Sequence, residues 1–143
     1  MIFTSEEELP IKSNKLESIF LAGSMDTQLS HNWRKQVMDA YLGDYNFFDP
    51  TNSNYEKLNT FDMKLHIQWE LDALAMSDKI LLNFLPDALS PISLAELGLY
   101  VATNKLTVVC PKEFYKSSYV HALCKKYGTP IFNKINTALT ELS

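Results

Sequence analysis

The chain has 143 residues, of which 46% are hydrophobic and 21% are charged, and its formal net charge is −4. This length suits one domain with one core, and this composition excludes a disordered tail, a collagen-like fibre and a disulfide scaffold. The acidic balance argues against a long nucleic acid, whose backbone needs many clustered Lys and Arg, although a mononucleotide remains possible. We expect a single domain over residues 1–143, with residues 1–17 as a loosely held lead-in.

The cysteines and the N-terminus bear on cellular context. Cys110 and Cys124 belong to no metal-ligand motif, so neither structural zinc nor a secreted, disulfide-bridged framework is expected. The N-terminus is acidic where a signal peptide would be basic, and the most apolar run, 80–85, is too short to span a bilayer. We expect a reduced, cytoplasmic protein that contacts no membrane and needs no metal or cofactor.

Short apolar runs alternate along the chain with longer segments of helical periodicity. The expected strands are 18–22, 46–48, 79–84, 106–110 and 131–132. The expected helices are 31–42, 61–76, 91–103, 116–127 and the C-terminal tail, with a polar loop over 51–59. This alternation predicts a parallel sheet with helices on both faces, whose ligands bind beyond the carboxyl ends of the strands. The site should therefore come from the turns after Ala22, Phe48, Phe84 and Cys110.

The segment 61–76 is ambiguous, because its first thirteen residues alternate strictly between apolar and polar, as in a strand. That length is unusual for a strand, and the composition of Met, Lys, Leu, Gln, Glu and Ala favours a helix. We therefore predict a helix. On it, Asp62, His66 and Glu70 form one polar column.

Gly23 and Ser24 directly follow the first expected strand. A glycine there lets backbone amides approach an anion, and the serine hydroxyl adds a donor. The pair matches neither the GxGxxG motif nor the P-loop, so a turn with a capping serine is the simpler explanation without further support.

Glu96 lies in the second turn of an otherwise apolar expected helix. A carboxylate among apolar neighbours is costly unless it is hydrogen-bonded or used, and a helix N-terminus favours the ionised form that a nucleophile needs. A surface glutamate on the helix edge is the alternative. Gly98 in the same helix costs about 1 kcal/mol relative to alanine, which indicates close packing or the approach of a ligand.

Glu70 lies near enough in the chain to face the same crevice as Glu96. Two carboxylates in one pocket, one ionised and one held protonated, are the equipment of retaining glycosyl transfer. A solvated helix face of alternating charge is the alternative. Asp62 and His66 could ligate a metal, but no third ligand is in view.

Several strings together resemble the nucleoside 2-deoxyribosyltransferase-like family, in particular its small members. They are FLAGS at 20–24, WR at 33–34, WEL at 69–71 with SDKI at 77–80, and SPISLAELG at 90–98. The likeness covers about 19–131. It implies a flavodoxin-like or Rossmann-like three-layer sandwich with a mostly parallel five-stranded sheet, and cleavage of the N-glycosidic bond of a nucleoside or nucleotide.

The resemblance also implies roles for individual residues. Glu96 matches the nucleophile that attacks the anomeric carbon, and Glu70 matches the acid that protonates the departing base. Ser24 and Ser90 match serines of the related 2′-deoxynucleoside 5′-monophosphate hydrolases, in which a serine contacts phosphate. The other candidate substrate-binding residues are Gly23, Trp33, Asp49, Gly98, Ser117 and Tyr119.

The sequence departs from the family pattern in two places. After the second strand, Asp49-Pro50-Thr51-Asn52 replaces the Asn-Pro-Arg-Arg of many small relatives. Tyr119 stands near the point where the transferases place an asparagine that enters the neighbouring subunit's site. The resemblance thus implies a homodimer or a larger homo-oligomer.

The resulting hypothesis is an N-glycosidase or deoxyribosyltransferase acting on a small-molecule nucleoside or its 5′-monophosphate. Glu96 would form a glycosyl-enzyme intermediate, and Glu70 would act as acid and then as base. Trp33 is the first candidate to stack on the base, unless it belongs to the core. The alternatives are a nucleotide-binding module that has lost turnover, and an accessory protein whose carboxylates only support folding.

Overall fold

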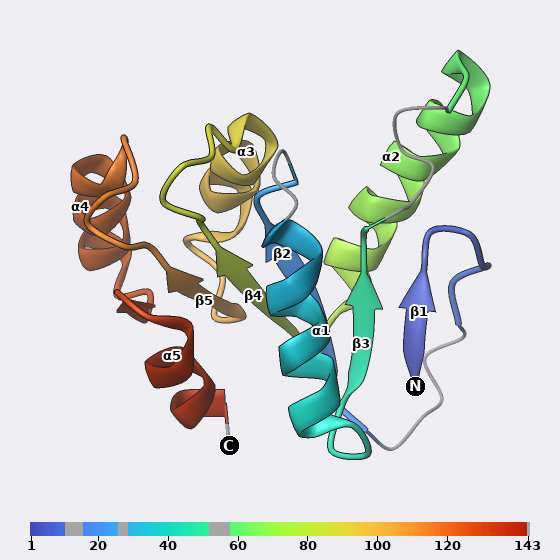
Figure 1. The fold of residues 1–143 in the computed structure, drawn as a ribbon, viewed down its shortest axis with the longest axis horizontal. Coiled ribbons are helices and arrows are strands. Elements are labelled where there is room, and N and C mark those ends of the chain that lie inside the picture. The colour runs from blue at the N-terminus through green and yellow to red at the C-terminus, as the bar shows by residue number, and fades with distance from the viewer. Residues whose placement is uncertain (11–15, 26–28, 52–57, 143) are drawn as a thin grey trace.

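The computed structural model describes residues 1–10, 16–25, 29–51 and 58–142, which form an α/β fold around one parallel sheet (Figure 1). The described strands are β1 (Ile2–Thr4), β2 (Ser18–Gly23), β3 (Asn46–Asp49), β4 (Lys79–Asn83), β5 (Leu106–Val109) and β6 (Ile131–Phe132). The described helices are α1 (Leu29–Tyr41), α2 (Thr60–Met76), α3 (Pro91–Tyr100), α4 (Ser117–Tyr127) and α5 (Ile135–Leu142). The strand order is β1-β3-β2-β4-β5-β6, and every pairing is parallel.

Helices cover both faces of this sheet, which confirms the predicted Rossmann-like three-layer sandwich. On one face, α2, α3 and α4 contribute Trp69, Leu97 and Val120 to a core built on the β2, β4 and β5 side chains. On the other face, α1 and α5 contribute Val37 and Ala138 to a second core. Because apolar helices bury both of its faces, β2 is buried at every position, as expected for a central parallel strand.

The sheet has one strand more than the five expected, because the segment interpreted as a lead-in contains β1. Ile2 pairs with Phe47 of β3, and the ring of Phe3 lies 5.6 Å from that of Phe48. Three residues are too few to show a periodicity, so only the free edge of β3 reveals this strand. Residues 11–15 of the lead-in and 52–57 of the expected loop lie outside the described residues.

The ambiguous segment forms the helix α2, as its composition predicted. Asn59 caps its N-terminus by accepting a hydrogen bond from the backbone N–H of Asp62 at 2.8 Å. The helix buries His66 from the polar column and leaves apolar side chains exposed at the alternating positions, namely Phe61, Leu65, Ile67 and Leu71. The alternation therefore reflects apolar residues on both sides of a helix rather than one face of a strand.

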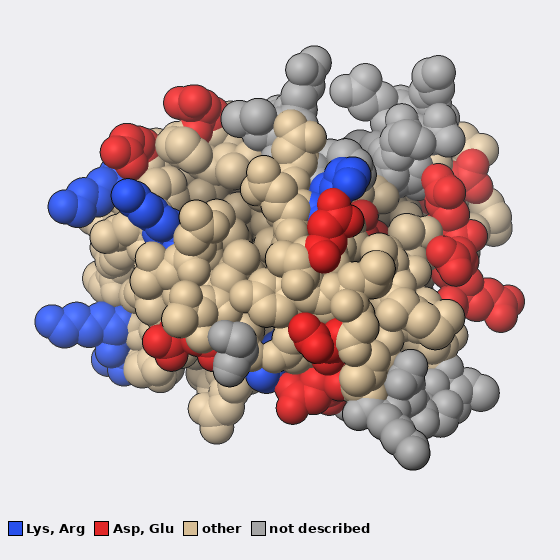
Figure 2. Space-filling view, turned by 60° about the horizontal axis from the view of Figure 1, so that its bottom comes forward, with Lys and Arg blue, Asp and Glu red and all other residues tan. Residues whose placement is uncertain are grey.

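The charged side chains on one face of the molecule are of both signs. Figure 2 shows Lys and Arg mostly toward the left edge of this face, whereas Asp and Glu lie at several places across it, some of them close to the basic residues. The described part of this face thus carries no continuous basic band of the kind that tracks a phosphate backbone. Within the described residues, no helix combines the length and the apolar content needed to cross a bilayer.

Candidate active site

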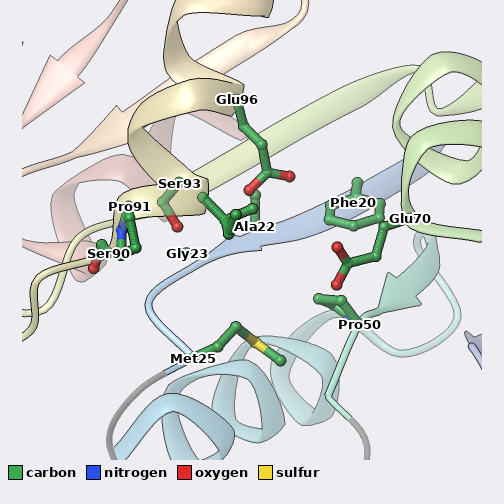
Figure 3. A pocket seen from close by; sticks show the side chains of 11 residues that line it. Phe20, Ala22, Gly23, Met25, Pro50, Glu70, Ser90, Pro91, Ser93 and Glu96 are labelled. Carbon is green, nitrogen blue, oxygen red and sulfur yellow. The ribbon is translucent and has the colours of Figure 1, made fainter. Parts of the chain in front are cut away.

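The carboxyl end of β2 and the N-terminal half of α3 border a cavity of about 310 Å³ (Figure 3). From β2 the chain continues to β3 on one side, and from β4 it continues to β5 on the other, so the connections diverge here. Three of the four turns expected to build the site line this cavity, through Gly23 and Met25, through Pro50, and through residues 90–93. None of the described lining residues comes from the turn after Cys110.

The floor of the cavity requires a glycine at position 23. Gly23 has a φ of +146°, which side chains rarely adopt, and a Cβ atom there would lie 2.3 Å from the carbonyl oxygen of Asn83. The same Cβ would lie 3.1 Å from Cζ2 of Trp33. Glycine at this position therefore lets the ends of β2 and β4 approach each other closely.

Ser24 and Ser90 meet at the N-terminal end of α3. Their Oγ atoms share a hydrogen bond of 2.5 Å, and the backbone N–H of Leu85 donates to Oγ of Ser24 at 3.0 Å. Ser90 is the one non-glycine residue with a positive φ (54°) in the described chain, a strain of about 1–3 kcal/mol that is typical of functional sites. Since Ser90 makes no side-chain cap and lines the cavity, the first turn of α3 opens onto it.

Two carboxylates reach the cavity from different helices. Figure 3 shows Glu96 of α3 and Glu70 of α2 on opposite sides of the space above Ala22 and Phe20 of β2. Glu96 is only 9% exposed, and its pKa is raised to about 8. Burial is the largest cause, the negative charge of Glu70 adds to it, and the positive charge of Arg34 partly offsets both. Desolvation thus opposes the ionised form of Glu96, which the helix N-terminus was expected to favour.

Glu70 is held by a neighbour on its own helix. Nε2 of His66 lies 3.0 Å from Oε1 of Glu70, one turn further along α2. The His66 side chain is 3% exposed and that of Glu70 is 18% exposed, so the pair is largely shielded from water.

Arg34 is a site residue that the sequence analysis did not single out. Its fully buried guanidinium donates to the carbonyl oxygens of Leu21 (2.9 Å), Gly23 (3.2 Å) and Ser24 (3.4 Å), and so holds the turn after β2. Burial lowers the pKa of Arg34 to about 10, and the negative charges of Asp49, Glu96 and Glu70 oppose that shift. At neutral pH the group stays charged. The sequence did offer a signal for Arg34, namely a charged residue on the apolar side of α1, directly after the buried Trp33.

Residues 16–114 match the model of the nucleoside 2-deoxyribosyltransferase-like family. The chain belongs to this family. No curated protein matches the chain. Family membership supports an enzyme of the deoxyribosyltransferase-like type and a small nucleoside as its ligand. The matched segment contains both carboxylates, Arg34, and the serines of the α3 turn.

Trp33 and Asp49, two of the candidate substrate-binding residues, lie in the core or behind the cavity. Trp33 is 6% exposed and packs in the core beneath α1, so it does not line the cavity. Asp49 is buried at the end of β3 and accepts hydrogen bonds from the backbone N–H and the hydroxyl of Thr51, at 3.0 and 2.6 Å. Its neighbour Pro50 forms part of the wall instead.

The remaining candidates lie around α4 and the outer side of α3. Gly98 and Tyr119 line a second cavity, of about 610 Å³, and a Cβ atom on Gly98 would meet no atom within 4 Å. The hydroxyl of Ser117 donates to the carbonyl oxygen of Lys112. The structure of the single chain does not bring these three residues to the cavity of Glu96.

The walls of the cavity are mainly apolar. Besides the residues that the sequence pointed to, the lining consists of Phe20, Ala22, Met25, Pro50, Pro91, Ile92 and Ser93. Such side chains look like ordinary core or turn residues in a sequence, so although most of them lie in or beside the strings compared with the family, no pattern marked them individually as lining residues. In the described parts of the chain, no group of three or more His, Cys, Asp and Glu side chains is placed to hold a metal ion.

Proposed function

We propose that the protein cleaves the N-glycosidic bond of a 2′-deoxynucleoside or its 5′-monophosphate through a glycosyl-enzyme intermediate. The observation that carries the proposal is that Glu96 and Glu70, from separate helices, line one cavity and interact electrostatically. The volume of this cavity falls at the lower end of the range of small-ligand pockets, roughly 300–1,000 Å³. A cytoplasmic location is part of the proposal, supported by the free thiols of Cys110 and Cys124.

The reaction follows from two carboxyl groups in different protonation states. In the first step the Glu96 carboxylate attacks C1′ while Glu70 gives its proton to the departing base. In the second step Glu70 accepts a proton from water, which attacks C1′ and releases Glu96. A second base in place of water would give transfer instead of hydrolysis.

The reactive form of this pair holds one proton, and that proton is on Glu70. Two carboxylates in one cavity repel each other, so one of them binds a proton more readily than it would alone. Arg34 favours the ionised form of Glu96, because its charge lowers the pKa of that carboxyl. Arg34 thus supports the distribution in which Glu96 is the nucleophile.

The serine pair supports a 5′-monophosphate as substrate. Ser24 and Ser90 supply two hydroxyls beside the first turn of α3, where backbone N–H groups and the helix dipole attract an anion. A phosphate there would separate the two hydroxyls and accept hydrogen bonds from both. Ser90→Ala should therefore weaken cleavage of a monophosphate more than cleavage of its nucleoside.

Base release tests the proposed function. Purified protein is incubated with deoxynucleosides and their 5′-monophosphates, and free base is measured by chromatography. We expect release from at least one substrate, and a loss of 10³-fold or more in Glu96→Gln, as for removal of a nucleophile. Glu141→Gln, which removes an exposed carboxylate on α5, should match the wild type. Absence of release from every substrate would contradict the proposal.

A nucleotide-binding module without turnover is the second candidate. The pKa of about 8 at Glu96 favours it, because a protonated glutamate is not a nucleophile. This candidate predicts a higher Tm in the presence of a nucleotide, with no base released on long incubation.

A further inference from the structure

His66 is a buried polar side chain that the two steps above do not use. A buried imidazole costs free energy unless it is hydrogen-bonded, and Oε1 of Glu70 lies 3.0 Å from its Nε2 atom. The two residues are spaced i, i+4 on α2, so the helix itself keeps them adjacent.

We propose that His66 is the positioning residue of the acid–base group, holding Oε1 of Glu70 so that Oε2 carries the proton delivered to the departing base. This inference rests on the proposed function. It assigns a role to each oxygen of Glu70, and it concerns a residue that neither step requires as a reactant.

The two oxygens of a protonated carboxyl are unlike. One is a carbonyl oxygen, which only accepts hydrogen bonds, and the other is a hydroxyl, which donates its proton. The terminal torsion of a glutamate is broad, so nothing intrinsic decides which oxygen faces the substrate. An N–H donated from Nε2 of His66 to Oε1 makes Oε1 the carbonyl oxygen, and therefore leaves the proton on Oε2.

The same bond assists the reaction as it proceeds. In the first step the Oε2 proton passes to the base, the electron pair of the C1′–N bond goes with the base, and Glu96 bonds to C1′. Glu70 is then a carboxylate, and the bond from Nε2–H to Oε1 becomes charge-assisted and stronger. In the second step Oε2 takes a proton from water. His66 keeps its own proton throughout, so protons move only among Glu70, the base and water.

The test compares two amide variants of His66. The side chain of Gln places its nitrogen near the position of Nε2, whereas that of Asn places it near Nδ1. We expect His66→Gln to keep kcat within about 3-fold of wild type on the nucleotide that the wild type cleaves fastest. We expect His66→Asn to lower kcat about 10- to 100-fold with little change in KM, because the donor to Oε1 is lost.

A second substrate separates positioning of the acid from general damage. The 4-nitrophenyl 2-deoxyribofuranoside 5-phosphate loses its leaving group as a phenolate, which needs no proton. Single-turnover release from it should be nearly equal in wild type, His66→Asn and Glu70→Gln, while Glu96→Gln should fail on both substrates. His121→Asn is the matched control, since that half-buried histidine bonds the carbonyl oxygen of Cys110 outside the cavity.

The outcomes distinguish this inference from the function on which it rests. If the wild type cleaves nucleotides but Asn and Gln behave alike at position 66, or if Asn slows both substrates equally, the positioning role is wrong. If the wild type releases no base from any nucleotide, the proposed function itself fails. Circular dichroism and Tm of each variant identify a loss that comes from misfolding. If His66→Asn is misfolded, kcat of His66→Gln is compared with that of the wild type instead. A kcat within about 3-fold supports the positioning role, and a larger loss in a folded variant contradicts it.

Discussion

At the scale of single residues, opposing charges are buried around one small cavity. Arg34 is fully buried, yet it stays charged because three backbone carbonyls accept its hydrogen bonds and acidic groups lie nearby. Glu96 is nearly as buried, and desolvation favours its neutral form. Chemistry and stability therefore make opposite demands on Glu96, because attack on a sugar needs the ionised form.

The buried Glu96 should make the protein less stable as the pH rises. Its pKa is about 8 in the folded protein and about 4.5 in the unfolded chain, so between these values the folded state holds a proton that the unfolded state releases. This group therefore penalises folding progressively from about pH 4.5 to pH 8. We expect Glu96→Gln to raise Tm by several degrees at pH 8 and by much less at pH 5, measured by calorimetry. Glu141→Gln should follow the wild-type curve, and parallel curves for Glu96→Gln would contradict the burial effect.

The pH dependence of turnover should show the same ionisation. Because the reactive form of the two carboxyl groups holds one proton, kcat/KM should fall as the pH rises through about 8, where the pair loses that proton. Initial rates of base release between pH 5.5 and 9 measure this. A kcat/KM that still rises above pH 8 would contradict the one-proton form of the pair.

At the scale of elements, the ends of two strands and the start of one helix define the cavity. Arg34 of α1 donates a hydrogen bond to the turn after β2, and Ser24 of that turn is hydrogen-bonded to Ser90 at the start of α3. The positive φ of Ser90 turns the chain into α3 with no side-chain cap. Strain and uncapped amides at one helix end cost stability that a purely structural turn would avoid, which is typical of a binding site.

Two glycine-to-alanine changes test this geometry. At Gly23 a Cβ would lie 2.3 Å from a backbone oxygen at a φ of +146°, so Gly23→Ala should lower stability by about 2 kcal/mol or more. At Gly98, in the interior of α3 with open space around it, alanine should instead raise stability by about 0.5–1 kcal/mol. Denaturant midpoints of the two variants provide the comparison. Similar midpoints would mean that the β2 turn does not need glycine.

At the scale of the whole molecule, most of the exposed large apolar side chains belong to the three helices on one face of the sheet. The outer surface of α2, α3 and α4 exposes Phe61, Leu65, Ile67, Leu71, Ile92, Leu99, Tyr119 and Tyr127. These three helices cover the same face of the sheet, and the start of α2 projects beyond it (Figure 1). Because exposed apolar surface is common at interaction sites, we propose that a second copy of the chain covers part of these helices.

Sedimentation equilibrium tests this self-association. We expect a homodimer or a larger assembly for the wild type, and dissociation to monomers in Leu65→Glu, because a charge buried at an interface is costly. Leu42→Glu is the control, since Leu42 is 62% exposed and follows α1 on the opposite face. A monomeric wild type at tens of micromolar would refute the proposal.

The local sequence determined most of the elements. Apolar runs and helical periodicity, with composition deciding for α2, located five of the six described strands and all five described helices, and Gly128 ends α4 with a φ of 69°, as its position predicted. The sequence also placed Glu70, Ser24 and Ser90 on the turns and helices that line the cavity. These features were readable because they depend on neighbours a few residues away, where turn and capping chemistry act.

Only the tertiary structure decided which side chains share the cavity and how they are charged. The strand β1 exists because β3 offers a free edge, and Arg34 reaches the β2 turn because α1 packs across it. Trp33 and Gly98 have plausible sequence positions, yet packing places one in the core and the other outside the cavity. The protonation of Glu96 depends on the water removed by residues distant in sequence. Desolvation and pairing are properties of the assembled fold, and no local pattern encodes them.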